Sequence, residues 1–390
     1  MDRALYGPDG FFVAGAGPAA HFRTSVHASP VFAAALLAVV HQVDAALGHP
    51  ARLDVVDVGA GRGELLSALG VSAGCALGSA GWALGVSGEP TRSGRSGLIP
   101  PRAGSPETPT ATATARSSPS GSGIVVRPSR SDHQHKALHP PIAERLRLTA
   151  VERAPRPRDL PEEINWVDEI PDPITGLLLA TEWLDNVPLD VAVQSDDGWR
   201  YLLVDPATGE ESVGDPVSPV DEEWLDRWWP TTPAASGARA EIGRTRDEAW
   251  AEAVAKMDRG LALAVDYGHL RDSRPVDGTL TGYRGGRQVP PVPDGSGDVT
   301  AHVAVDSVAS AGERVARCAY RLVSQREALR ALGADGGRPP LSLAASDPAG
   351  YVRALAAAST VAELTDPAGL GGHWWLLQPV DVALDPLMAR

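Results

Sequence analysis

Cysteine is scarce in this sequence of 390 residues, and the scarcity removes one class of architecture from consideration. The two cysteines, Cys75 and Cys318, lie far apart and form no CxxC pair. We therefore expect neither a disulfide framework nor a cysteine-based zinc site. Long apolar runs are lacking too, because the longest, Val31–Val40, is about half a membrane span. Met1–Phe12 lacks the basic-then-apolar order of a signal peptide. These features predict a soluble, cytoplasmic protein without a membrane span.

Positive charge is in deficit. Asp and Glu number 49 against 35 Lys and Arg, which gives a formal net charge of −14. A general nucleic-acid binder would present a basic face to the phosphates, so no nucleic-acid partner is expected. The hydrophobic content of 43% is sufficient for the core of one large α/β domain or two small ones.

Large apolar residues become sparse between residues 72 and 141, where Ser, Gly, Pro and Thr dominate. A segment of this composition cannot bury enough surface to offset the entropy of ordering. We interpret 72–141 as a disordered, low-complexity insertion into the fold. It contains the histidines His133, His135 and His139, but in such a tract we predict no metal site. The remaining chain divides into a helical segment, 1–50, and an α/β domain, 51–390.

The ordered remainder alternates helices and strands. Helices are predicted over residues 29–47, 64–69, 239–257, 313–332 and 347–358. Strands are predicted over 53–58, 147–152, 176–180, 260–266 and 374–378, with 190–193 and 199–204 as an antiparallel pair. This alternation is typical of a doubly wound, mostly parallel sheet, here with added N-terminal helices and antiparallel strands.

The first buried strand ends in a glycine loop, Asp57–Gly63, in which Gly59, Gly61 and Gly63 form a G-x-G-x-G pattern. Glycines permit a tight turn and let a ligand approach the backbone closely. A dinucleotide fingerprint has its third glycine one position later, where Glu64 would oppose a pyrophosphate. S-adenosylmethionine, which has no phosphate, therefore fits better than NAD. A glycine turn without a ligand is the alternative interpretation.

Three further strands end in acids: Glu152, the pair Glu182 and Asp185, and Asp266. Ligands of open parallel sheets bind at the carboxyl ends of the strands, so these acids are expected to converge. An acid at Glu152 would accept hydrogen bonds from ribose hydroxyls, and without the insertion it follows the glycine loop at about the usual 20 residues. The alternatives are an ordinary exposed glutamate at 152 and a helix cap near 185.

Several short segments, in this order, resemble those of one family. They are Tyr6–Phe12, His21–Ser29, Asp57–Leu65, Thr181–Pro188, Asp266–Gly268, Thr279–Arg284 and Asp298–Val303. Outside the insertion, the sequence is similar to the MidA-like class I methyltransferases, bacterial proteins related to the mitochondrial protein arginine methyltransferase NDUFAF7. The resemblance implies a Rossmann-like methyltransferase domain over 51–390, S-adenosylmethionine as cofactor, and an arginine of a protein substrate as acceptor.

Strand ends and resemblance together suggest three groups of site residues. We expect cofactor binding by Asp57, Gly59, Gly61, Gly63 and Glu152. We expect catalysis by Glu182 and Asp185, whose carboxylates would orient a guanidinium and favour its lone pair. We expect the acceptor side to include Asp298 and His302, although a structural hydrogen bond is an equal alternative for the histidine.

The sequence also departs from the family where an acceptor would bind. His27 and Ala28 stand in place of Pro-Glu, and Thr181 stands in place of Asn, so an acid and an amide are missing. These departures leave open a second interpretation, a non-catalytic assembly factor or scaffold that binds the cofactor and recognises a partner protein. The oligomeric state is not predicted.

Overall fold

The computed structural model describes residues 1–14, 30–75, 139–230, 236–334 and 336–383. Most of the predicted insertion lies outside the described residues, as do the substituted positions His27 and Ala28 and the histidines His133 and His135. The helix that follows the glycine loop, α5 (Glu64–Cys75), extends four residues into the range assigned to the insertion.

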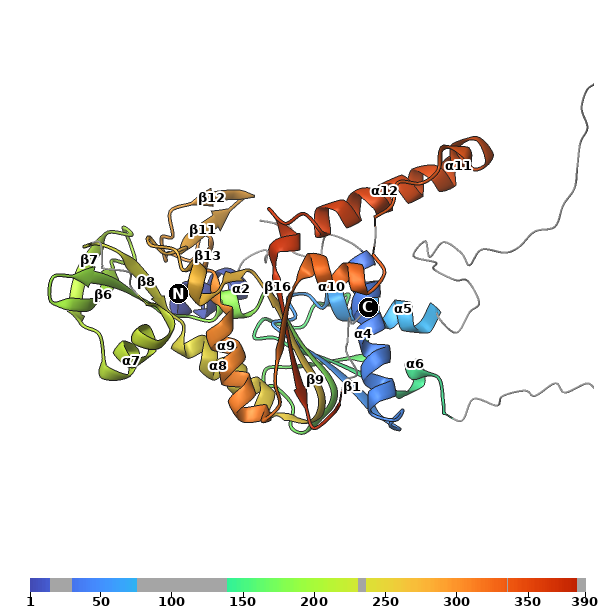
Figure 1. Cartoon of the computed structure of the whole chain (residues 1–390), viewed down its shortest axis with the longest axis horizontal. Helices are drawn as coiled ribbons and strands as arrows, with labels where there is room; N and C mark the ends of the chain where they lie inside the picture. The colour runs from blue at the N-terminus through green and yellow to red at the C-terminus, as the bar shows by residue number, and fades with distance from the viewer. Residues whose placement is uncertain (15–29, 76–138, 231–235, 335, 384–390) are drawn as a thin grey trace, which may run out of the picture. The chain divides into compact units, whose positions relative to one another are not determined.

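Seven strands form the central sheet in the order β15-β16-β9-β4-β1-β2-β3 (Figure 1). Their bounds are Leu53–Val58 (β1), Leu146–Val151 (β2), Ile164–Val167 (β3), Ile174–Thr181 (β4), Met257–Asp266 (β9), Arg321–Ser324 (β15) and Trp374–Val380 (β16). β16 pairs antiparallel with β9 and β15, and the other neighbouring strands of this sheet pair in parallel. The chain order reverses at β1, between β2 and β4, which is the usual place for a ligand.

Helices cover both faces of this sheet (Figure 1). On β1, Val55 packs with α4 (Pro30–Ala46) and α5, whereas Val56 faces the opposite core with α8 (Arg244–Ala255) and α9 (Val305–Ala316). All six β1 residues are buried, four of them apolar and two of them the aspartates Asp54 and Asp57. The doubly wound α/β fold predicted from the sequence is confirmed.

Smaller sheets add to this core. The predicted antiparallel pair is present as β5 (Asp190–Ser195) and β6 (Gly198–Val204), within a four-stranded sheet. The further strands are β7 (Glu211–Pro216), β8 (Arg239–Ile242), β10 (Gly268–His269), β11 (Thr281–Arg284), β12 (Arg287–Val289), β13 (Asp298–Thr300) and β14 (Val303–Ala304). The further helices are α1 (Asp2–Tyr6), α2 (Phe11–Ala14), α6 (Ile142–Arg145), α7 (Pro219–Trp228), α10 (Gln325–Ala331), α11 (Leu341–Ser346) and α12 (Pro348–Leu364). No helix among the described residues is long and apolar enough to cross a membrane.

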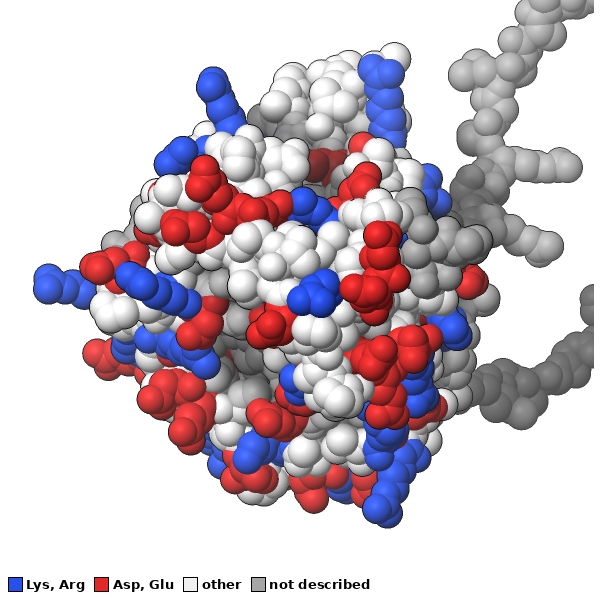
Figure 2. Space-filling view, turned by 90° about the vertical axis from the view of Figure 1, so that its left-hand side faces the viewer, with Lys and Arg blue, Asp and Glu red and all other residues white. Residues whose placement is uncertain are grey.

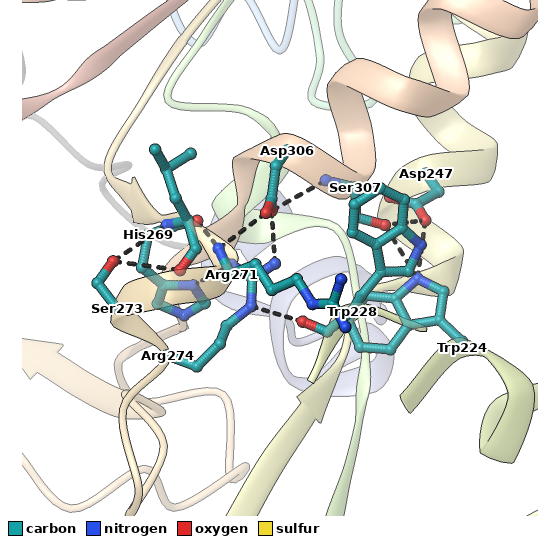
Figure 3. Close-up of polar contacts among 10 residues, drawn as sticks. Trp224, Trp228, Asp247, His269, Arg271, Ser273, Arg274, Asp306 and Ser307 are labelled. Atoms are coloured by element: carbon teal, nitrogen blue, oxygen red, sulfur yellow. Dashed lines mark hydrogen bonds and ion pairs between the residues drawn. The ribbon is translucent and has the colours of Figure 1, made fainter. Parts of the chain in front are cut away.

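A cluster of polar contacts joins α7 to α8, α9 and β10 (Figure 3). Trp224 donates its indole N–H to Asp247 Oδ2 of α8 at 2.8 Å. Arg274 donates to the carbonyl oxygens of Trp228 and His269, at 2.9 and 2.7 Å, and forms an ion pair with Asp306 of α9. These bonds fix the segment that follows Asp266 against α9.

The predicted helix over 239–257 is wrong at its start. Residues Arg239–Ile242 form β8, which pairs with β5, and α8 begins only after Gly243. The last residue of the range, Met257, already belongs to β9. Pairing with a distant strand overrides the local helical pattern here, which sequence periodicity cannot show.

The predicted helix over 313–332 is wrong in its middle. α9 ends at Ala316, where Arg317 adopts a left-handed φ of 54°, and β15 pairs with β16 before α10 begins. Ser324 and Glu327 form a capping box at the start of α10. That Ser-x-x-Glu pattern is a local start signal that the sequence analysis passed over.

Candidate cofactor site

A cavity of about 580 Å³ opens at the carboxyl ends of β1, β2 and β4. Its wall includes the segments Asp57–Arg62, Val151–Arg153, Asp168–Ile170, Thr181–Trp183 and Asp185–Pro188. The volume is typical of a site for a small organic molecule. The structure therefore brings together the glycine loop and two of the three acid-bearing strand ends that the sequence predicted to converge.

The glycine loop turns away from β1 in left-handed backbone conformations. Gly59 and Gly61 have φ values of 72° and 58°, which side chains disfavour. A Cβ at Gly59 would lie 2.8 Å from Cδ1 of Trp183, so the loop approaches this indole closely. Gly63, the third predicted cofactor-binding glycine, does not line the cavity, and a Cβ there would lie 2.5 Å from Cδ1 of Leu160.

Glu152 links the end of β2 to the glycine loop. Its Oε2 accepts a hydrogen bond from Gly61 N at 3.0 Å, and its Oε1 accepts from Arg153 N at 2.7 Å and Ala154 N at 3.1 Å. Two carboxylate oxygens offer about four acceptor positions, so Oε2 keeps capacity for a ligand hydroxyl. The predicted acid is thus positioned at the cavity.

Glu64 lies at the N-terminus of α5 and accepts a hydrogen bond from Arg62 N at 3.1 Å. This carboxylate takes a loop amide that a phosphate would otherwise bind, and its charge repels anions. The geometry agrees with a cofactor that carries no phosphate.

Asp57 is a buried carboxyl in the cavity wall, only 2% exposed. Its Oδ1 has no hydrogen-bond partner among the described residues. Burial, followed by the nearby carboxylates of Glu152 and Glu64, raises the pKa of Asp57 to about 8. An unpartnered buried oxygen of this kind fits a ligand that brings a hydrogen-bond donor or a positive charge, and S-adenosylmethionine brings both.

On the opposite wall, Glu182 follows β4 with a φ of 51°, a conformation uncommon for a residue with a side chain. Its backbone N–H donates to Val265 O of β9 at 2.8 Å, which holds the turn against the neighbouring strand. The predicted catalytic glutamate therefore lines the cavity on a locally strained turn.

Asp185, the second predicted catalytic acid, lies in a short 3-10 helix, Leu184–Asn186, and is buried. Its Oδ2 accepts hydrogen bonds from the hydroxyls of Tyr267 and of Thr300, the latter at 2.8 Å, and its Oδ1 accepts from Asn186 Nδ2 at 2.9 Å. Burial raises the pKa of Asp185, while the Tyr267 and Thr300 bonds oppose that rise. These contacts hold the carboxylate in place, and its catalytic role stays a prediction.

Arg246 was not identified from the sequence, although it organises this wall. It is 1% exposed and donates to four carbonyl oxygens, those of Asp185, Val187, Ala301 and His302, at 2.5 to 3.1 Å. Burial lowers the pKa of Arg246, an effect that the nearby carboxylates oppose. An arginine on a predicted helix is usually exposed, so no sequence signal separates this one from its neighbours.

Asp266, the last residue of β9, accepts hydrogen bonds from the turn that follows β4. Its Oδ2 accepts from the backbone N–H groups of Leu184 and Asp185, at 3.0 and 3.2 Å, and its Oδ1 accepts from Tyr267 N at 3.0 Å. Burial raises the pKa of Asp266 well above its usual value. The acid predicted at the end of this strand is therefore present at the site as a buried support.

Asp298 and His302 lie on either side of Thr300, next to the Asp185 cluster, and neither lines the cavity that the described residues form. Asp298 is 1% exposed with neither carboxylate oxygen partnered among the described residues, and burial raises its pKa to about 7. The exposed His302 has its ring 5.2 Å from that of Tyr267, edge to face. Their role toward the acceptor stays a prediction.

Tyr6 closes the cavity from the N-terminal side. Its hydroxyl donates to Asn186 O at 3.2 Å, and the Arg153 guanidinium lies 4.9 Å above its ring. The tyrosine belongs to a segment that resembled the family, but no role was predicted for it. Among the described residues, no group of three metal-ligating side chains is found.

Comparison with known proteins supports this geometry. A family described as S-adenosyl-L-methionine-dependent methyltransferases matches residues 126–323, just over half of the chain, although the glycine loop lies outside the matched range. A curated relative is the mitochondrial protein arginine methyltransferase NDUFAF7 of Danio rerio, 31% identical over 199 residues. That alignment covers 47% of this chain and 44% of the zebrafish protein, so the chain spans under half of that relative's length.

Two crystal structures of proteins from Burkholderia thailandensis share the fold. One, bound to S-adenosyl-homocysteine, has a TM-score of 0.67 and 21% identity, and the comparison covers 100% of this chain and 89% of the other. The second, a native structure from the same superfamily, has a TM-score of 0.65 and 22% identity, with coverages of 99% and 87%. With the family match over half of the sequence, the chain belongs to the S-adenosyl-L-methionine-dependent methyltransferase family.

Proposed function

We propose that this protein transfers the methyl group of S-adenosylmethionine to a side chain of a protein substrate, and that the acceptor is arginine. One observation carries the cofactor part: the glycine loop, Glu152 and the unpartnered Asp57 line the same cavity. The arginine part rests on the likeness to the zebrafish arginine methyltransferase.

The cofactor would be held by Asp57, Gly59, Gly61 and Glu152, with Gly63 shaping the turn. S-adenosylmethionine supplies an electrophilic methyl group on a positively charged sulfur. The glycine loop offers backbone surface for close approach, and Glu152 Oε2 accepts from a ribose hydroxyl while it holds Gly61 N. Asp57 offers a buried oxygen, without a partner among the described residues, to a hydrogen-bond donor or positive charge of the cofactor.

On the acceptor side, Glu182 would accept a hydrogen bond from the substrate nitrogen and hold its proton as the new N–C bond forms. Asp185, which is 2% exposed and accepts hydrogen bonds from Asn186 and Thr300, would act by holding this wall in place. Asp298 and His302 would border the acceptor. This arrangement favours a cationic acceptor, which carboxylates can hold in a near-attack position.

A protein acceptor in the cytoplasm completes the proposal. The face shown in Figure 2 carries intermingled acidic and basic side chains, without a continuous basic patch on its described residues, which favours protein over nucleic acid as partner. The cytoplasmic location is supported by the scarcity of cysteine.

A labelling experiment tests this proposal. The purified chain is incubated with bacterial extract and methyl-deuterated S-adenosylmethionine, and the protein fraction is hydrolysed and analysed for methylated arginines by mass spectrometry. Deuterated methylarginine is expected with the wild type and not with Gly61→Val. Label on another residue contradicts the arginine assignment. A wild type that binds the cofactor but labels nothing favours the assembly-factor interpretation.

A further inference from the structure

The charges that line the cofactor cavity are strongly uneven. Acidic residues outnumber basic ones by nine to three among the lining residues. The three bases are Arg62, Arg153 and Lys256, and each forms an ion pair with an aspartate, at 3.7, 3.9 and 3.3 Å. All three side chains are more than 40% exposed, so water screens them.

The acids of the inner wall are different, because they are removed from water. Asp57 and Asp185 are each only 2% exposed. Asp185 is surrounded by hydrogen-bond donors, whereas Oδ1 of Asp57 has no partner among the described residues. Burial raises the pKa of Asp57 to about 8. A positive charge placed beside this carboxyl would lower its pKa and favour the ionised form. The inner wall therefore favours a cationic ligand.

An aromatic side chain lines the same cavity as this carboxyl. Trp183 is half-buried, lines the cavity and packs against Gly59, two residues after Asp57. The face of an indole attracts cations more strongly than other aromatic rings do. A leucine of similar burial would offer the same apolar contact without this attraction, which makes the two effects separable by substitution.

We propose that this cavity distinguishes the cofactor from its product by charge, with Asp57 and the indole of Trp183 favouring a positive sulfonium over a neutral thioether. The inference rests on the proposed cofactor site. Methyl transfer leaves the bonding electron pair on sulfur, so S-adenosylmethionine is cationic at this atom and S-adenosylhomocysteine is not. When transfer is complete, the sulfur no longer carries the positive charge that the wall favours. Unreacted cofactor then displaces the product.

Calorimetry on the whole chain with three ligands tests this. The probes are S-adenosylmethionine, S-adenosylhomocysteine and sinefungin, in which a carbon bearing an amine replaces the sulfonium. We expect the two cationic ligands to bind about tenfold more tightly than S-adenosylhomocysteine. The ratio of the affinity for S-adenosylmethionine to that for S-adenosylhomocysteine should fall about fivefold in Trp183→Leu. Trp183→Phe, which keeps an aromatic ring, should preserve most of this affinity ratio. Asp57→Asn weakens the cationic ligands selectively.

Trp199→Leu serves as the matched control, because Trp199 is a half-buried tryptophan of β6 that does not line the cavity. The affinity ratio of S-adenosylmethionine to S-adenosylhomocysteine in Trp199→Leu should equal that of the wild type. Equal affinity of the wild type for cofactor and product overturns the inference, as does a uniform loss for all three ligands in Trp183→Leu. Failure of every ligand to bind the folded wild type overturns the proposed cofactor site as well, so the two failures are distinct.

Discussion

On the cofactor side of the cavity, Glu152 accepts a hydrogen bond from a backbone amide of the short glycine loop. On the wall proposed for the acceptor, here called the acceptor wall, four distant segments contribute side chains that meet: Asp185, Arg246, Tyr267 and Thr300. The cofactor wall depends on backbone conformations that only glycine adopts easily. The acceptor wall depends on buried charges that compensate each other. Substitutions should therefore affect ligand binding on one side and folding stability on the other.

The largest effect on stability is expected for Arg246→Met, which would remove the hydrogen bonds that hold the acceptor wall together. Four carbonyl oxygens lose their donor, and buried carboxylates lose their positive neighbour. We expect the free energy of unfolding to fall by about 3–5 kcal/mol, measured by chemical denaturation. Arg246→Lys keeps the charge and should lose less. A loss below about 1 kcal/mol for the methionine variant would contradict this account.

Gly61→Val should break the cofactor wall instead. The position has a φ of 58°, and a β-branched residue there displaces the loop that Glu152 holds. We expect the affinity for S-adenosylhomocysteine to fall by about a hundredfold in calorimetry. Gly285→Val is a matched control, because Gly285 has the same φ of 58° with open space around it, outside the cavity. Equal losses of affinity in both variants would contradict a specific role of the glycine loop, because backbone strain at any such glycine would then explain the effect.

Asp57→Asn sharpens the comparison, since Asp57 is a buried ionisable group within the cofactor wall. Native Asp57 keeps its proton up to about pH 8, whereas an unfolded chain releases it near pH 4, so its contribution to stability falls as pH rises between these values. Glu152 and Glu64 face this carboxyl and add to the effect. Without ligand, the advantage of Asp57→Asn over the wild type in free energy of unfolding should therefore grow steadily as the pH rises from about 4 to about 8. A pH-independent difference in denaturation would contradict the assignment.

The smallest expected effect belongs to Thr300→Val. The variant removes a hydroxyl that hydrogen-bonds to Asp185 and to the Tyr267 hydroxyl, and it keeps the shape of the side chain. The free energy of unfolding should fall by about 1 kcal/mol, while the affinity for S-adenosylhomocysteine stays within about twofold. Thr208→Val, at an exposed turn outside the cavity, controls for the substitution itself. A large loss of affinity would mean that the two walls are not separate.

The same contrast explains what the sequence could predict. The glycine loop and β1 lie within a dozen residues and carry local signals, so both were predicted with their correct bounds. Glu152 was placed correctly because strand ends of a parallel sheet share one edge. Arg246 and the pairing of β8 with β5 were missed, because they depend on contacts with segments about 50 residues away. The catalytic role of Asp185 stays a prediction, and the structure adds that its carboxylate accepts hydrogen bonds from Asn186 and Thr300.

Calorimetry with S-adenosylhomocysteine on the wild type, Glu152→Gln and Asp185→Asn measures directly which residues hold the cofactor. Circular dichroism first establishes that all three proteins are folded. We expect Glu152→Gln to weaken binding about tenfold, because the glutamate holds the glycine loop, and Asp185→Asn to remain within about twofold of the wild type. Equal losses in the two variants, or no binding by the wild type, would contradict a cofactor site built from the glycine loop and Glu152.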